Sequence, residues 1–235
     1  MDIQDLKLGQ KLEMPLAKVS QKNEKYEWRK EERKIYLPKS KPELIQIPGA
    51  KYFEISGVGN PNLEDFSERV SVLYSLSYAV RMMPKNGSTP DGYFEYTVYP
   101  LQGIWDNKSD TCNKDTLNKD DFIYTIAIKQ PQFVTDEIFT KALEIASKKK
   151  PHPLQNEVKL ITREDTLCVQ LMHTGSYDSE PDSFKKMNIF LMQNRLERKS
   201  TSHQEIYIKP KKDGMTVLDL EKLNTVLRYE CRKVV

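Results

Sequence analysis

The segment S-H-Q-E-I-Y-I-K, residues 202–209, alternates polar and apolar side chains with the two-residue period of a β-strand. Ile206 and Ile208 share one face of the predicted strand, and Glu205 and Tyr207 share the other. A carboxylate in the middle of a strand is costly to bury unless a cation or a hydrogen-bond donor meets it. Glu205 therefore has two interpretations: it lies on a solvated outer face, or it is a buried acid with a function.

The segments around this strand predict the second of two similar modules. Residues 166–175, T-L-C-V-Q-L-M-H-T-G, predict a strand that ends at a glycine. Pro181 then lies in the first turn of a helix that runs to about residue 198. Strands at 204–209 and 224–232 complete a strand–helix–strand–strand order.

The first half of the chain predicts the same order with negligible sequence identity. Its elements are a strand at 51–59, a helix at about 63–83 with Asn62 as its N-cap, and strands at 93–99 and 121–129. The inner face of that helix is expected to carry Leu63, Phe66, Val70, Leu73, Ser77 and Val80. The repeat is therefore one of pattern.

These elements give the expected domain organisation. A charged extension occupies 1–24, a mostly extended lead-in 25–45, module one about 45–130, a connecting helix with Thr135 as its N-cap about 134–148, and module two about 157–235. We predict an α+β fold of tandem modules in which each sheet covers one face with its own helix. The opposite faces are expected to meet across a pseudo-two-fold axis and to enclose a ligand cleft.

Composition excludes several classes of protein. The 235 residues are 38% hydrophobic and 30% charged, which predicts a globular chain with a sizeable core. The net charge of +3 is too small to indicate nucleic-acid binding. No apolar run is long enough to span a bilayer and the N-terminus lacks a signal-peptide pattern, which predicts a cytoplasmic protein with no membrane partner.

Several familiar chemistries lack their motifs. Cys112, Cys168 and Cys231 are odd in number and widely spaced, so no disulfide framework is expected. The three histidines have no metal-ligand spacing, so we predict no metal site and no cofactor. A G-x-S-x-G elbow and a glycine-rich phosphate loop are also missing, which argues against an ordinary serine or cysteine hydrolase.

Seven collinear stretches resemble the GyrI-like small-molecule-binding proteins, in particular the longer stand-alone bacterial group. They are Y-E-W-R-K-E-E-R-K-I-Y-L-P-K-S-K-P-E-L-I (26–45), L-Y-S-L-S-Y (73–78), P-L-Q-G-I-W (100–105), I-K-Q-P-Q-F-V-T (128–135), V-Q-L-M-H-T-G-S-Y-D-S-E-P (169–181), H-Q-E-I-Y (203–207) and L-N-T-V-L-R (223–228). The resemblance implies tandem modules around a ligand cleft. It also implies that a buried glutamate on a late strand, here Glu205, meets flat and often cationic ligands.

Some members of this group are similar to hydrolases that open the cyclopropane ring of DNA-alkylating antibiotics. The resemblance then implies an aromatic cage around the bound drug. Its members here are Tyr74, Tyr78, Trp105, Phe122, Tyr124, Tyr177 and Tyr207. The chain departs from the family pattern at Gln102, at Asp106, where a second tryptophan is usual, and at Gln204, where a second histidine is usual.

Glu205 and Tyr177 each have two interpretations as functional residues. Glu205 either pairs with a cationic ligand or removes a proton from a water that attacks the ring carbon. The Tyr177 hydroxyl holds a water or a ligand oxygen, or Tyr177 is a turn residue whose ring packs on the next helix. Phe122 and Tyr124 share a strand face, as Glu205 and Tyr207 do, so both pairs are expected to line one cavity.

Three functions remain open. The chain is a xenobiotic-binding module for flat aromatic molecules, a cyclopropane-opening hydrolase, or an inhibitor of a protein partner such as DNA gyrase. The last ranks lowest because the sequence shows no acidic, DNA-like surface.

Overall fold

The structure is a computed structural model that describes residues 24–107, 119–211 and 214–234. The predicted extension 1–24 therefore lies, except for Glu24, outside the described residues, as does Cys112. All the strand pairs are antiparallel, and the sheet order is β1-β6-β9-β8-β3-β4-β2-β5, with β7 pairing with β9. The strands are β1 Glu43–Ile47, β2 Ala50–Val58, β3 Leu101–Asn107, β4 Phe122–Gln130, β5 Lys159–Arg163, β6 Thr166–Thr174, β7 Leu196–Arg198, β8 His203–Lys209 and β9 Asn224–Lys233.

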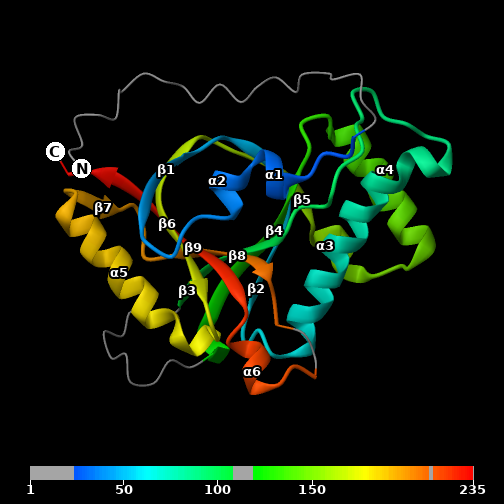
Figure 1. The fold of residues 1–235 in the computed structure, drawn as a ribbon. Helices are drawn as coiled ribbons and strands as arrows, with labels where there is room; N and C mark the ends of the chain where they lie inside the picture. Colours follow the sequence, from blue (N-terminus) through cyan, green and yellow to red (C-terminus); the bar gives the residue numbers. More distant parts are fainter. Residues whose placement is uncertain (1–23, 108–118, 212–213, 235) are drawn as a thin grey trace.

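Two strand–helix–strand–strand modules build this sheet, so the predicted α+β fold is confirmed. Module one is β2-α3-β3-β4 and module two is β6-α5-β8-β9, with β7 inserted before β8. The helices are α1 Trp28–Glu31, α2 Arg33–Tyr36, α3 Glu64–Met82, α4 Asp136–Lys149, α5 Glu180–Gln193 and α6 Val217–Leu220. In Figure 1, α5 lies to the left and α3 to the right of the central strands β3 and β8.

The modules join edge to edge. Strand β3 pairs with β8, with Gln102 opposite Ile206 and Trp105 opposite His203. The expectation that two separate sheets face each other is therefore wrong in that form. Each module ends in an edge strand with unpaired backbone groups, and pairing β3 with β8 satisfies them in one continuous sheet. Because β3 and β8 hold equivalent places in their modules, this junction lies on the pseudo-two-fold axis.

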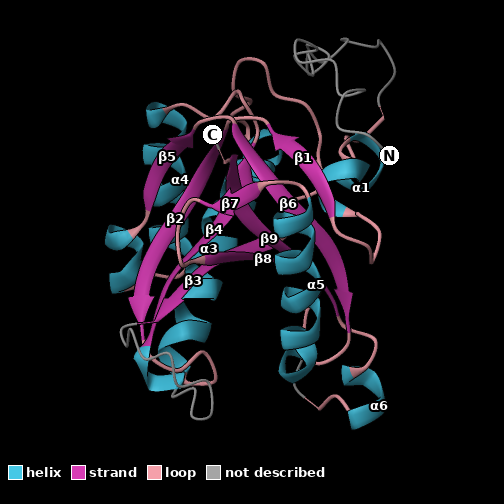
Figure 2. Ribbon diagram, turned by 90° about the vertical axis from the view of Figure 1, so that its left-hand side faces the viewer, coloured by secondary structure: helices cyan, strands magenta, loops and turns pink. Residues whose placement is uncertain are grey.

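The two faces of the sheet are covered differently. Helices α3 and α5 pack on one face, which we call the helix face (Figure 2). It carries the side chains of Trp105, Phe122, Tyr124, Glu205 and Tyr207. The segment before β1, residues 24–42 with α1 and α2, is the N-terminal arm; it covers the opposite or arm face, which carries Gln102, Gln170, Gln204 and Arg228.

Helix α3 confirms the periodicity argument in its C-terminal half. Leu73, Ser77 and Val80 are buried, as the three- and four-residue steps require. The start of the helix was predicted wrongly: Leu63 is the N-cap and is 59% exposed, whereas Asn62 donates two hydrogen bonds to Asn60. Thr135 caps α4 as predicted, accepting a hydrogen bond from the Ile138 backbone at 3.3 Å.

The strand predicted at 93–99 is wrong. This segment is a loop with a single bridge, between Tyr26 and Tyr96, and the strand lies at Leu101–Asn107 instead. The aromatic side chains imitate a strand pattern, but they pack on the arm and on Phe133: the Tyr99 hydroxyl, for example, donates to Glu32 at 2.5 Å. Gly103 and the glutamine before it obscured the true strand, because neither is typical of a strand interior.

Two further boundaries differ from the prediction. The second module's helix ends at Gln193 rather than near residue 198, because Arg195 takes a positive φ of 52° and strand β7 begins directly afterwards. The lead-in at 25–45 is not mostly extended, since it forms the short helices α1 and α2. Among the described residues, no helix combines the length and the apolar character needed to cross a membrane.

Candidate ligand site on the helix face

Glu205 lies near the middle of β8 and points toward α5 on the helix face. Its side chain is only 12% exposed. The Tyr207 hydroxyl donates to Glu205 Oε2 at 2.9 Å, and His203 Nε2 lies 2.9 Å from Oε1. The solvated-face interpretation is therefore wrong: this carboxyl group is removed from water and held by two polar neighbours on its own strand.

A second acid, Glu180, meets Glu205 from the first turn of α5. Glu180 is 6% exposed, and its carboxyl group lies within hydrogen-bonding reach of Glu205. Burial and, after it, the charge of the neighbouring Glu205 together raise the pKa of Glu180 to about 9. Within residues 24–107, 119–211 and 214–234, no group hydrogen-bonds to its Oε1 atom. Glu180 therefore holds a proton at neutral pH beside the carboxyl group of Glu205.

Sequence reasoning missed Glu180. An acidic residue beside Pro181 at the start of a helix is common because it complements the helix dipole, so the sequence does not mark Glu180 as a site residue. Nothing in its spacing links it to Glu205, which lies on another element. The signal was its place within the stretch H-T-G-S-Y-D-S-E-P, five residues after Gly175, which directly follows β6.

Trp105 and Tyr207 join the two modules over this acidic pair. The Trp105 indole Nε1 donates to the Tyr207 hydroxyl at 2.9 Å, and that hydroxyl donates onward to Glu205. Gly103 stands opposite Glu205 in the β3–β8 register. A Cβ atom on Gly103 would lie 2.5 Å from Trp105 Nε1 and 3.2 Å from the Tyr207 hydroxyl, so only glycine leaves room for this arrangement.

The predicted pair Phe122 and Tyr124 continues the same surface. The Trp105 ring lies 5.7 Å from the Phe122 ring and 5.4 Å from the Tyr124 ring. Phe66 of α3 stacks on Trp105 at 5.7 Å, although the sequence pattern assigned Phe66 only to the helix core. These rings pack against one another in the structure, and Trp105 connects them to Tyr207 and Glu205.

Tyr177 also reaches the site. Its ring meets Tyr207 edge to face at 6.1 Å, and its hydroxyl accepts a hydrogen bond from the Lys211 backbone at 3.4 Å. Burial raises the pKa of both phenols, and the charge of Glu205 adds to the effect, so both remain protonated donors at neutral pH.

Tyr74 and Tyr78 lie apart from this group. Their rings face each other at 6.4 Å on α3, and Tyr78 is 48% exposed. The Tyr74 hydroxyl is hydrogen-bonded to the backbone of Leu101, which is four residues from Trp105, or about 13 Å along the strand. The structure thus brings Glu205, Tyr207, Trp105, Tyr177, Phe122 and Tyr124 together, and leaves the two α3 tyrosines at the margin.

The charge balance of the site is acidic. Across residues 24–107, 119–211 and 214–234, no lysine or arginine forms an ion pair with Glu180 or Glu205, and His203 is the basic side chain that contacts Glu205. The same residues contain no group of three His, Cys, Asp or Glu side chains suited to a metal ion. The site can thus supply two carboxyl oxygens and flat aromatic surface.

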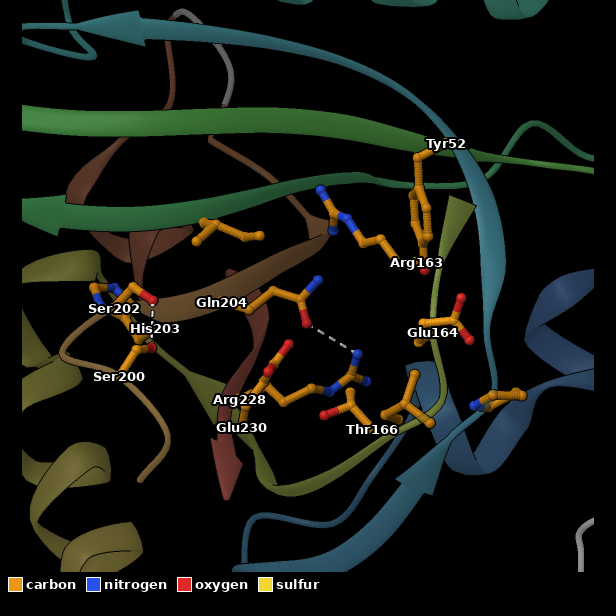
Figure 3. Close-up of a pocket in the computed structure, with 13 residues that line it drawn as sticks. Tyr52, Arg163, Glu164, Thr166, Ser200, Ser202, His203, Gln204, Arg228 and Glu230 are labelled. Carbon is orange, nitrogen blue, oxygen red and sulfur yellow. Dashed lines mark hydrogen bonds between the residues drawn. The ribbon is translucent and has the colours of Figure 1, made fainter. Parts of the chain in front are cut away.

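A separate cavity of about 160 Å³ opens on the arm face, and its lining does not include Glu205. Arg163 and Arg228 line it together with Glu164 and Glu230 (Figure 3). Arg163 is paired with Glu54 at 2.9 Å.

Arg228 is 3% exposed and donates to neutral oxygens: to the side chain of Gln170 at 2.8 Å, to that of Gln204 at 3.2 Å and to the Ile35 carbonyl at 3.0 Å. Gln170 in turn donates to the Lys34 carbonyl at 2.8 Å. Arg228 therefore ties strands β6, β8 and β9 to the N-terminal arm.

Comparison with known proteins places the chain among bacterial relatives. No model of a known protein family matches it, and neither does any curated protein. An uncharacterized conserved protein from Listeria innocua is 34% identical and superposes with a TM-score of 0.79 over 88% of this chain and 100% of that one. Two structures described as a hydrolase from the same organism are 31% and 32% identical, with TM-scores of 0.78 and 0.79 over 88% and 89% of this chain and all of theirs. The chain belongs to the same family as these Listeria proteins.

Proposed function

We propose that this chain is a GyrI-like small-molecule-binding protein that captures flat aromatic and often cationic xenobiotics on the helix face, giving sequestration or protection. One observation carries the proposal: Glu180 and Glu205 are buried together beside aromatic side chains, and no described lysine or arginine neutralises them. A buried acidic pair without a cationic partner is costly to the protein alone. A ligand cation supplies the missing charge.

The aromatic residues supply the second requirement, a surface for a planar ligand. Phe66 and Phe122 are half-buried and contact Trp105 from two sides. Each ring contact contributes about 0.5–1.5 kcal/mol beyond the area it buries. A flat ligand that takes the place of Phe66 against Trp105 exchanges one ring contact for another, so the packed rings are no large barrier to binding.

The test is binding of a flat cationic dye such as acridine orange, measured by fluorescence. Glu205→Gln removes one charge from the site and is expected to weaken binding at least about tenfold, equivalent to about 1.4 kcal/mol. Glu197→Gln is the matched control: Glu197 lies on β7, is exposed and pairs with Arg232, so affinity is expected to stay unchanged. Equal affinity for wild type and Glu205→Gln contradicts the proposal.

A second candidate function is hydrolysis of a cyclopropane-bearing alkylator. Two observations favour it: two related structures are described as hydrolases, and Glu180, whose pKa is raised to about 9, is an acid that can donate a proton beside the carboxyl group of Glu205. Glu205 takes a proton from water while the water oxygen bonds to the ring carbon. The strained carbon–carbon bond breaks, its electron pair moves into the conjugated ring system, and a proton from Glu180 neutralises the oxygen that gains charge. Tyr177 holds the water or the ligand oxygen.

The two functions separate in one assay. A cyclopropane-containing alkylator is incubated with substoichiometric protein, and the ring-opened product is followed by chromatography. Turnover that is lost in Glu205→Gln and retained in Glu197→Gln supports the hydrolase. Binding without product supports sequestration.

A further inference from the structure

We propose that the Glu180–Glu205 pair adjusts its charge to its ligand: it keeps its shared proton when a neutral or singly charged flat molecule binds, and it releases that proton when a doubly charged cation binds. This inference rests on the proposed function, since it concerns the same site.

The geometry makes one proton the natural occupant of the free pair. Glu180 comes from the first turn of α5 and Glu205 from β8, and their carboxyl groups lie within hydrogen-bonding reach of each other. Both are shielded from solvent, so two negative charges at this distance repel strongly. One proton between the carboxyl groups removes the repulsion and forms a hydrogen bond.

Within the part of the chain that the structure describes, no lysine or arginine pairs with Glu180 or Glu205 and could take the place of that proton. From β8, His203 and Tyr207 contact Glu205, and from the turn before α5, Tyr177 and Asp178 lie close to the pair. Trp105 of β3 reaches it through Tyr207. Tyrosine and tryptophan add neutral donors and Asp178 adds negative charge, and among the described residues His203 is the basic side chain that contacts Glu205.

Ligand charge then decides the state of the pair. With one proton the pair carries one negative charge, which balances a single ligand cation. Without the proton it carries two, which balance a dication. Glu180 Oε1, which has no partner in the structure, is an oxygen available to a second cationic group. A single site can therefore balance either one or two positive charges on the ligand without leaving a net charge buried.

Linkage gives a measurable consequence. A binding step that releases one proton becomes up to about tenfold tighter for each unit of increasing pH, as long as the free pair still holds the proton. The affinity for a dication is therefore expected to rise up to about 100-fold between pH 6.5 and 8.5. The affinity for a neutral molecule of the same shape is expected to stay constant.

The experiment is isothermal titration calorimetry at pH 7.5 in buffers of different ionisation enthalpy, which counts released protons. The probes are three flat molecules of similar size: 1,1′-dimethyl-4,4′-bipyridinium as the dication, 1-methyl-4-phenylpyridinium as the monocation and 4-phenylpyridine as the neutral form. For wild type we expect about one proton released per bound dication and close to none for the other two. Glu180→Gln is expected to bind the monocation and to release no proton with any probe, and Glu197→Gln to match wild type.

Each outcome decides the matter. Equal proton release with monocation and dication, or undiminished release in Glu180→Gln, overturns the inference while leaving ligand binding intact. Binding of none of the probes to wild type overturns the proposed function and this inference with it. Infrared difference spectra of wild type provide a readout that needs no variant: the carbonyl band of a protonated carboxyl group is expected in the free protein and is lost on adding the dication. A band that persists with bound dication contradicts the inference.

Discussion

The two faces of the sheet handle buried charge in opposite ways. On the arm face each nitrogen of the Arg228 guanidinium donates to a neutral oxygen, and no carboxylate of the described residues is among its hydrogen-bond partners. On the helix face Glu180 and Glu205 lie together, and no described residue hydrogen-bonds to Glu180 Oε1. A buried charge whose hydrogen bonds are complete holds the fold together, whereas one with an open oxygen can receive a ligand.

The largest expected effect comes from removing the hydrogen bonds that Arg228 makes on the arm face. Arg228→Met removes the guanidinium that donates to Gln170, Gln204 and the Ile35 carbonyl, and takes from the buried Gln170 oxygen its charged donor. We expect the free energy of unfolding to fall by about 3–5 kcal/mol. Urea denaturation measures it. Arg232→Met on the same strand is the control, because Arg232 forms an exposed pair with Glu197 that contributes at most about 1 kcal/mol; equal losses in both variants would contradict the comparison.

A smaller effect is expected from pH on the helix face. The pKa of Glu180 is raised to about 9, so between its unfolded value and pH 9 the folded state binds more protons than the unfolded state. Stability is therefore expected to decrease as pH rises, by at most about 2.7 kcal/mol from pH 6 to pH 8. Denaturation curves across this range measure the slope. Glu180→Gln is expected to flatten it, and an unchanged slope in that variant means that the proton lies elsewhere.

The smallest of the three effects tests the contact between the modules. In Gly103→Ala the new methyl group displaces Trp105 and breaks its hydrogen bond to Tyr207, which we expect to cost about 1–2 kcal/mol of stability. Trp105 fluorescence, isolated in a Trp28→Phe background, is expected to shift to longer wavelength as the indole becomes hydrated. If the emission is unchanged, the rings are not in tight contact at this position.

The sequence predicted the features that depend on neighbouring residues, such as the faces of a strand and the buried side of a helix. The alternation in 202–209 placed Glu205 and Tyr207 on one face, and the spacing in α3 placed Leu73 and Val80 in the core. Strand β3 was not predicted because Gly103 interrupts its alternating pattern, although that glycine leaves the room that the Trp105 side chain occupies. The β3–β8 pairing and the meeting of Glu180 with Glu205 depend on tertiary contacts between elements far apart in the chain, which no periodicity encodes.

The same limit explains the two tyrosines of α3. Tyr74 and Tyr78 are one helical turn apart, so the pattern correctly puts them side by side. Which part of the sheet they face depends on how the helix lies along β3, and Tyr74 reaches Leu101 at the start of that strand rather than Trp105 near its end.

The seam between β3 and β8 gives the ligand site an unusual mechanical position. Trp105 belongs to module one and Glu205 to module two, and the described β3–β8 pairing consists of four residue pairs. A ligand that contacts both side chains links the two modules across this strand pair. Its binding energy then stabilises both modules at once, so at saturating ligand both halves are expected to unfold together at a higher temperature.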